Sequence, residues 1–164
     1  MSEAEQSFLD EFLAVAEQSA RDYARIHKRR FLHTLSTIPK AQTTPDMAIE
    51  FGTYGMFLLA LQDLAGYRQA DGTVWEEHTP HKILSRLYPF DKASRSFRLF
   101  NVNLEMECLP LPESQYDLVL CAEVLEHMSI DPMALLWEAN RVLKIGGKLM
   151  LTTPNACCAE NIER

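Results

Sequence analysis

The segment that most constrains the fold covers residues 116–155, which have the order strand, helix, strand. Residues 117–121 form a nearly continuous apolar run without alternation, which is typical of a parallel strand covered on both faces. The Asp-Pro pair at residues 131–132 suits a helix N-cap and first helical position, and the Gly-Gly pair at residues 146–147 is predicted to end that helix. A second apolar run follows at residues 148–153. This order and length predict two parallel strands joined by a right-handed crossover helix.

The crossover helix and the upstream part of the chain have readable apolar spacing. Leu135, Ala139 and Val142 recur at helical intervals and give the crossover helix an apolar stripe. Ser2 and Glu5 have capping-box spacing at the start of an N-terminal helical region. The other predicted elements are a helix to about residue 30, a short helix at 30–38 ended by Pro39, a strand at 47–51, a helix from residue 57 closed by Gly66, a strand at 73–75, a helix at 83–88 and a strand at 97–105.

Length, charge and cysteine usage exclude several classes of protein. The chain has 164 residues, enough for a substantial core, and no apolar run of membrane-spanning length. Its acidic N-terminus lacks the layout of a secretory signal, and a net charge of -7 argues against a nucleic-acid surface spread over the whole domain. The cysteines have no CxxC spacing, which predicts reduced thiols in a cytoplasmic protein; they are Cys108, Cys121, Cys157 and Cys158.

One local basic cluster lies in the N-terminal helical region. We interpret it as a solvated helix surface that balances the acidic start, and the alternative is a phosphate or nucleic-acid patch. Its members are Arg21, Arg25, Lys28, Arg29 and Arg30.

A glycine-containing turn follows the first predicted strand. Glu50 ends that strand, Gly52, Thr53 and Gly55 form the turn, and a helix follows. This arrangement brings backbone N–H groups close to a ligand in nucleotide-type folds. A plain strand-to-helix turn explains the same residues, so both interpretations stay open.

The 116–155 segment resembles the second half of the core of class I S-adenosylmethionine-dependent methyltransferases of the methyltransferase type 11-like group. The resemblance is carried by Tyr-Asp-Leu-Val at residues 116–119, Glu-Val-Leu-Glu-His at 123–127, the run at 141–147 that ends in Gly-Gly, and Thr-Thr-Pro-Asn at 152–155. Ile145 stands where the family usually has proline.

The resemblance implies an α/β fold with a Rossmann-like, mostly parallel sheet of strand order 3-2-1-4-5. We expect residues 1–40 to form an N-terminal helical cap and residues 41–164 to form a methyltransferase core that is truncated after strand five. The family sheet has two more strands, so we expect a fragment, a homodimer that closes the exposed edge, or a partner chain that completes the fold.

The resemblance also implies S-adenosylmethionine as cofactor and assigns the glycine turn to its methionyl end. Glu50 would take the ammonium group, and the backbone at Gly52, Thr53 and Gly55 would meet the carboxylate. Tyr54 departs from the family pattern because it stands where the middle glycine belongs. A side chain there either crowds the cofactor or marks a turn built differently.

Further cofactor contacts are implied at the ends of the later strands. Glu76, with Glu77 as its rival, would hold the ribose hydroxyls, and Glu105, with Asn103 as its alternative, would accept the exocyclic amine of adenine. For Glu76 the alternative interpretation is a surface acid before a loop. The loop after the fourth strand would lie at the methyl end of the cofactor; its residues are Cys121, Ala122 and Glu123.

The resemblance leaves the chemical roles after residue 123 open. His127 is our candidate for the general base, because its ordinary pKa lies near neutrality, or it is a structural histidine of the loop. Glu123, Glu126 and His127 would be able to seat Mg²⁺, but the same residues occur in family members without a metal, so we expect none.

These expectations predict a methyltransferase that modifies oxygen or nitrogen of a small molecule or glycan-like acceptor. Nucleic acid and membrane are not expected as partners. The competing interpretation is a catalytically inactive methyltransferase-like binding or assembly subunit.

Overall fold

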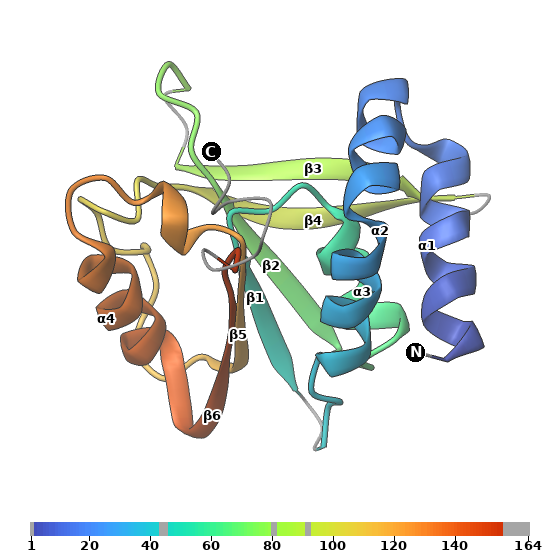
Figure 1. The fold of residues 1–164 in the computed structure, drawn as a ribbon. Helices are drawn as coiled ribbons and strands as arrows, with labels where there is room; N and C mark the ends of the chain where they lie inside the picture. Colours follow the sequence, from blue (N-terminus) through green and yellow to red (C-terminus); the bar gives the residue numbers. More distant parts are fainter. Residues whose placement is uncertain (1, 43–45, 80–81, 91–92, 156–164) are drawn as a thin grey trace.

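The computed structural model describes residues 2–42, 46–79, 82–90 and 93–155, which build one six-stranded sheet with helices on both faces (Figure 1). The strands lie in the order β3-β4-β2-β1-β5-β6. In chain order the elements are α1 (Glu3–Val15), α2 (Gln18–Thr37), β1 (Met47–Phe51), α3 (Met56–Asp63), β2 (Gln69–Val74), β3 (Ile83–Phe90), β4 (Ala93–Asn101), β5 (Tyr116–Ala122), the 3₁₀ helix η1 (Leu125–His127), α4 (Pro132–Val142) and β6 (Leu143–Thr152).

The predicted Rossmann-like fold class is confirmed, with one additional strand. The five predicted strands correspond to β1, β2, β4, β5 and β6, and each neighbouring pair among them is parallel. Their order in the sheet is β4-β2-β1-β5-β6, which is the predicted 3-2-1-4-5. The additional strand β3 pairs antiparallel with β4 at one edge. Helices α1 and α2 precede the sheet, and the domain boundary at residue 40 stays a prediction.

The helix predicted at residues 83–88 is wrong, because this segment is the strand β3. Its residues alternate between exposed and partly buried positions, which is the period of a strand with one face covered. Ile83 and Leu87 are exposed on one face, whereas Arg86 and Tyr88 lie on the other. Period-two alternation was therefore the signal in this segment, and the apolar content alone was misleading.

Several other predicted boundaries shift: α2 begins at Gln18, β2 at Gln69, β4 at Ala93 and β6 at Leu143, each earlier than predicted. The first N-terminal helix ends at Val15 rather than near residue 30, because Ala16 has an extended backbone (φ -71°, ψ 155°). The strand β4 ends at Asn101 rather than 105. The helix α4 ends at Val142, and Gly146, with φ +83°, lies within β6 at an irregularity of its pairing with β5. The Gly-Gly pair therefore shapes the strand instead of ending the helix.

Two apolar layers hold the helices against the sheet. Helix α3 packs on one face together with α1 and α2, and Leu58, Leu59 and Leu61 are fully buried there. Helix α4 covers the other face, and its predicted stripe of Leu135, Ala139 and Val142 is confirmed because all three are fully buried. Figure 1 shows α4 on one side of β5 and the helices α2 and α3 on the other. Within the described part of the chain, no helix has the length and apolarity needed to cross a membrane.

Candidate functional site

The candidate site lies where the parallel strands β1, β2, β4 and β5 end at one edge of the sheet. Parallel strands place their carboxyl ends together, so residues that follow these strands become neighbours. The fold therefore brings the glycine turn after β1, the acid after β2 and the loop after β5 to one edge.

Three backbone N–H groups of the glycine turn donate hydrogen bonds to acceptors within the protein. The N–H of Gly52 donates to Thr73 Oγ1 at 2.9 Å, and the N–H of Thr53 donates to the Thr73 carbonyl at 2.8 Å. The N–H of Gly55 donates to Thr53 Oγ1 at 2.9 Å. A ligand carboxylate that met these groups would have to replace these partners.

Glu50 is buried beneath the turn and is 3% exposed. Its Oε2 accepts a hydrogen bond from Thr53 Oγ1 at 2.5 Å. Burial raises the pKa of Glu50 to about 8, although the Thr53 hydroxyl and the Leu58 backbone N–H act in the opposite direction. A substantial fraction of Glu50 is therefore protonated at neutral pH.

Tyr88 and Val124, not Tyr54, contact the two glycines of the turn. Tyr54 is 93% exposed and leaves the turn open on its side. Gly55 has φ +96°, and a Cβ atom there would lie 2.3 Å from the ring of Tyr88. Gly52 has φ +72°, and a Cβ atom there would lie 2.7 Å from Val124 Cγ2. Both positions therefore require glycine for backbone conformation and for space. Tyr88 was missed because its segment was predicted to be a helix.

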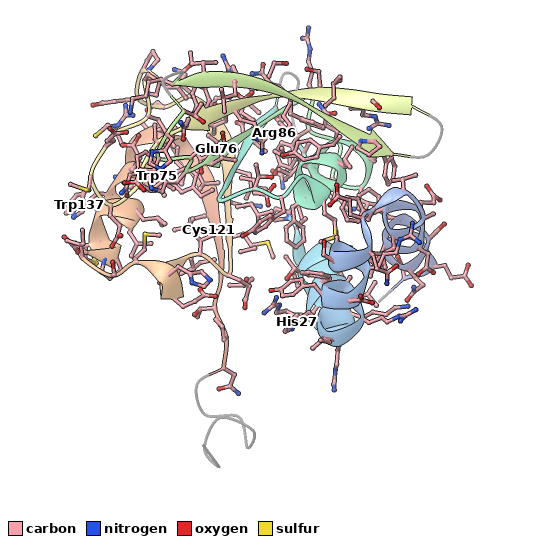
Figure 2. The ribbon with its side chains drawn as sticks, turned by 90° about the horizontal axis from the view of Figure 1, so that it is seen from above. His27, Trp75, Glu76, Arg86, Cys121 and Trp137 are labelled. Carbon is pink, nitrogen blue, oxygen red and sulfur yellow. The ribbon has the colours of Figure 1, made fainter. Side chains whose placement is uncertain are left out.

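Glu76 lies directly after β2 and is held by two side chains. Its carboxylate forms an ion pair with Arg86 of β3 and accepts a hydrogen bond from Thr79 Oγ1 at 2.9 Å. The hydrogen bond from Arg86 lowers the pKa of Glu76 most strongly. Asn101, a buried residue that sequence reasoning missed, accepts from the Glu76 backbone N–H at 2.8 Å. Figure 2 shows Glu76 and Arg86 next to each other, whereas the rival Glu77 is exposed.

Glu105 caps the loop that precedes α4. Its Oε1 accepts from the backbone N–H groups of Ile130 at 2.6 Å and Asp131 at 3.3 Å. The alternative residue, Asn103, accepts from the Glu105 N–H at 3.0 Å. A groove of about 860 Å³ runs from Glu105 along α4, and no residue of the glycine turn lines it.

The predicted residues at the end of β5 differ in exposure. Cys121 is fully buried, and burial raises the pKa of its thiol to about 12, so the thiol stays protonated. Ala122 is partly buried. Cys121 and the exposed Cys108 are free thiols, whereas Cys157 and Cys158 lie outside the described residues.

Glu123 joins the sheet to the N-terminal helices. It has φ +58°, a conformation uncommon for a residue with a side chain. Its N–H donates to the Thr152 carbonyl at 3.0 Å, and its Oε1 accepts from Thr152 Oγ1 at 2.9 Å. Its Oε2 pairs with Nη1 of Arg30 in α2 at 2.7 Å. These contacts hold the unusual conformation.

Two further residues of α2, Tyr23 and His27, lie beside Arg30 of this ion pair. Arg30 also donates to the hydroxyl of Tyr23 at 2.8 Å, and its guanidinium carbon lies 5.8 Å from the Tyr23 ring centroid. The imidazole of His27 packs on Tyr23 with ring centroids 4.3 Å apart. Burial and the charge of Arg30 lower the pKa of His27, and Glu123 opposes them. The sequence carried no motif for this group because α2 and Glu123 are far apart in the chain.

Most of the basic cluster in α2 has structural partners. Arg21 donates to the carbonyls of Ala16 and Ala14 at the end of α1, at 2.9 and 3.0 Å. Lys28 lies 3.7 Å from Asp10 of α1. These contacts favour the interpretation of a helix surface over that of an anion patch.

His127 lies exposed on η1, beside the exposed Glu126. Among the residues that the structure describes, no hydrogen bond to the His127 ring is found, and no cluster of three His, Cys, Asp or Glu residues is suited to a metal ion. The carboxylate of Glu123 is paired with the guanidinium of Arg30.

Comparisons with known proteins support the family resemblance and the fold class. The sequence model of the methyltransferase-domain family matches residues 82–151. A solved complex between the Haloferax volcanii Trm112 methyltransferase activator and a candidate methyltransferase contains a chain with the same fold, with a TM-score of 0.57 and 22% sequence identity. That match covers 85% of the present chain and 58% of the solved chain. No curated protein matches. The family match and the fold together confirm the resemblance of this chain to class I S-adenosylmethionine-dependent methyltransferases.

Proposed function

We propose that this chain is an S-adenosylmethionine-dependent methyltransferase domain that acts on oxygen or nitrogen of a small molecule or glycan-like acceptor. The family match supports methyl transfer as the general function. The observation that carries the proposal is the meeting of Glu50, the glycine turn and Glu76 at one edge of a parallel sheet, next to the loop at residues 123–127. We further propose a cytoplasmic location, because the described cysteines are free thiols.

Two buried polar atoms near this edge support the presence of a ligand. Within the described residues, the Tyr88 hydroxyl and the Arg30 Nε are buried without a well-formed hydrogen bond, and the guanidinium of Arg86 is the neighbour of the Tyr88 hydroxyl. Tyr88 lies against Gly55, and Arg30 pairs with Glu123 on the other side of the edge. Buried polar groups without partners are rare in native proteins, so each is a candidate to meet a ligand atom.

We propose the following roles for the residues that would hold the cofactor. Glu76 would hold the ribose hydroxyls, Glu105 or Asn103 the adenine amine, and the turn at Glu50, Gly52, Thr53 and Gly55 the methionyl end. Cys121, Ala122 and Glu123 would border the reactive end. When bound, the cofactor supplies an activated methyl group. The residues of this chain supply position and exclusion of water, and no covalent intermediate with the protein is needed.

Calorimetric titration with S-adenosylhomocysteine tests the proposal. We expect micromolar binding, and we expect Glu76→Gln to weaken it by about tenfold or more, because a charged hydrogen bond contributes about 1.5–3 kcal/mol. Glu77→Gln is the matched control, since Glu77 is exposed at the next position. Absence of binding at millimolar ligand would contradict the proposal.

A second candidate function is favoured by the hydrogen bonds that the glycine turn already makes within the protein. Its N–H groups at residues 52, 53 and 55 have protein partners, and Arg86 occupies the carboxylate of Glu76. An inactive methyltransferase-like binding or assembly subunit would have no need to open these contacts. The same titration separates the two functions, because only the enzyme binds the ligand.

We also propose that a partner chain or a second copy covers the β6 edge. This ten-residue strand pairs with β5, and its Leu149 and Leu151 are 39% and 38% exposed. Exposed edge strands are normally covered in native proteins. The solved chain of similar fold comes from a complex with an activator protein. Light scattering of the purified protein tests the second copy: a dimer supports it, and a monomer contradicts it and leaves the partner chain.

A further inference from the structure

We propose that His27 of α2 is the base on the acceptor side of the reaction, in place of His127. This inference rests on the proposed function, since it requires a methyl donor at the end of β5. The acceptor would carry a hydroxyl or an amine. Its proton would pass to the imidazole of His27 as the acceptor oxygen or nitrogen bonds to the methyl carbon. The carbon–sulfur bond breaks in the same displacement, and its electron pair stays on sulfur.

The first support is the position of His27 relative to the loop after β5. Arg30 lies one turn further along α2, and its 2.7 Å ion pair with Glu123 ties this part of the helix to that loop. The imidazole of His27 packs on Tyr23, whose hydroxyl accepts a hydrogen bond from Arg30, so it lies beside this ion pair. In Figure 2, His27 lies on the flank of α2 nearest to the β5 and α4 part of the molecule.

The second support is the way in which the imidazole is held. The Tyr23 ring packs on it at 4.3 Å between centroids, and Tyr23 is itself fixed by the 2.8 Å hydrogen bond from Arg30 to its hydroxyl. The ring is therefore oriented before an acceptor binds. His127 has no comparable support within the described chain, because it is exposed on a three-residue 3₁₀ helix.

The third support is the protonation state. The charged groups that face His27 are Arg30 on the same helix and Glu123 on the loop. Burial and Arg30 disfavour the imidazolium more strongly than Glu123 favours it, so the pKa of His27 is lowered. A neutral imidazole at physiological pH is the form that accepts a proton.

The test uses the charge of the donor as a local probe. S-adenosylmethionine carries a positive charge on sulfur that S-adenosylhomocysteine lacks. The imidazoles of the full chain are followed by NMR over a pH series, free and with each ligand. We expect His27 to bind its proton about tenfold more weakly in the S-adenosylmethionine complex than in the S-adenosylhomocysteine complex. The positive charge on sulfur would disfavour the protonated form of a nearby, partly buried imidazole. His27→Asn and His127→Asn assign the two signals, and His27→Gln serves if the first variant does not fold.

Each outcome of the NMR titration either supports or overturns the inference. A large difference at His27 and a small one at His127 support the inference. Equal protonation of His27 in the two complexes, or a larger response at His127, overturns the inference and leaves the proposed function intact. Failure of both ligands to bind overturns the proposed function, and the inference about His27 falls with it.

Discussion

The two sides of the candidate site are built in different ways. The motif side, residues 116–155, consists of β5, α4 and β6, and neighbours in sequence contact one another there. The turn side combines the glycine turn at residues 50–55 with Arg86 and Tyr88 of β3. The helix and strands of the motif side have local determinants, although Glu123 and Tyr116 also contact distant residues. On the turn side, Arg86 and Tyr88 reach the site only because β3 forms as a strand of the sheet. The turn side should therefore be the more sensitive to single substitutions.

The largest expected effect is the pH dependence caused by Glu50. Its folded-state pKa of about 8 lies above the ordinary value of 4.5, so the folded protein keeps a proton that the unfolded chain loses. The free energy of unfolding should therefore fall as pH rises from about 4.5 to about 8, by about 4 kcal/mol. Urea denaturation of the wild type and of Glu50→Gln across this range measures the effect. Equal pH dependence in both proteins would contradict it.

The next effect should come from Gly55→Ala. The added Cβ meets the Tyr88 ring at 2.3 Å, and φ +96° is strained for alanine. We expect the free energy of unfolding to fall by about 3 kcal/mol, from overpacking together with backbone strain.

Gly146→Ala is the matched control, because φ is +83° and nothing lies within 4 Å of the added atom. It should cost about 1 kcal/mol by backbone strain alone. If both variants lose the same free energy of unfolding, the Tyr88 ring adds no steric cost at Gly55, and the two sides of the site do not differ in sensitivity.

On the motif side, Glu138→Gln should cost about 2 kcal/mol. Glu138 is 4% exposed, accepts from the Leu109 N–H at 2.7 Å and pairs with Arg141. The substitution loses a buried charged pair while it keeps the size of the side chain. Asn140→Ala, at an exposed position of the same helix, is the control and should change stability little. A loss that exceeds that of Gly55→Ala would reverse the comparison.

The smallest effect on stability should follow Arg30→Gln. The ion pair with Glu123 is partly exposed, so its loss should cost about 1 kcal/mol or less. Removal of the charge of Arg30 should also raise the pKa of His27, because Arg30 is one of the groups that lower it. NMR titration of the imidazole measures this rise. Arg25→Gln is the control, because the Arg25 side chain is 81% exposed on the same helix and is not one of the groups that shift the pKa of His27; it should leave the pKa of His27 unchanged.

Local sequence signals predicted the motif side well. Asp131 accepts a hydrogen bond from the Met133 N–H at 2.9 Å, as expected of an N-cap, and Pro132 begins α4. The helical stripe of Leu135, Ala139 and Val142 is buried, and β5 is covered on both faces. These features depend on residues a few positions apart, so a single sequence is enough to find them.

The prediction failed at residues 83–88, where antiparallel pairing with the next strand decides the structure. Residues 83–88 have enough apolar content for a helix, but pairing with β4 makes them a strand. That strand carries Arg86 to Glu76 and Tyr88 to Gly55, and neither contact has a local signal. The roles of the predicted cofactor residues and of His127 stay predictions.

The sequence by itself determined the crossover helix, the parallel strands on either side of it and the acids that follow the strands, because periodicity and capping act over short distances. The order of the strands in the sheet came from the resemblance to the methyltransferase family. Only the tertiary structure decided which groups meet those acids. Arg30 reaches Glu123 across 93 positions of the chain, and Tyr116 reaches the buried Asp71 across 45. Such contacts depend on how the sheet and helices pack, and packing is a property of the whole folded chain.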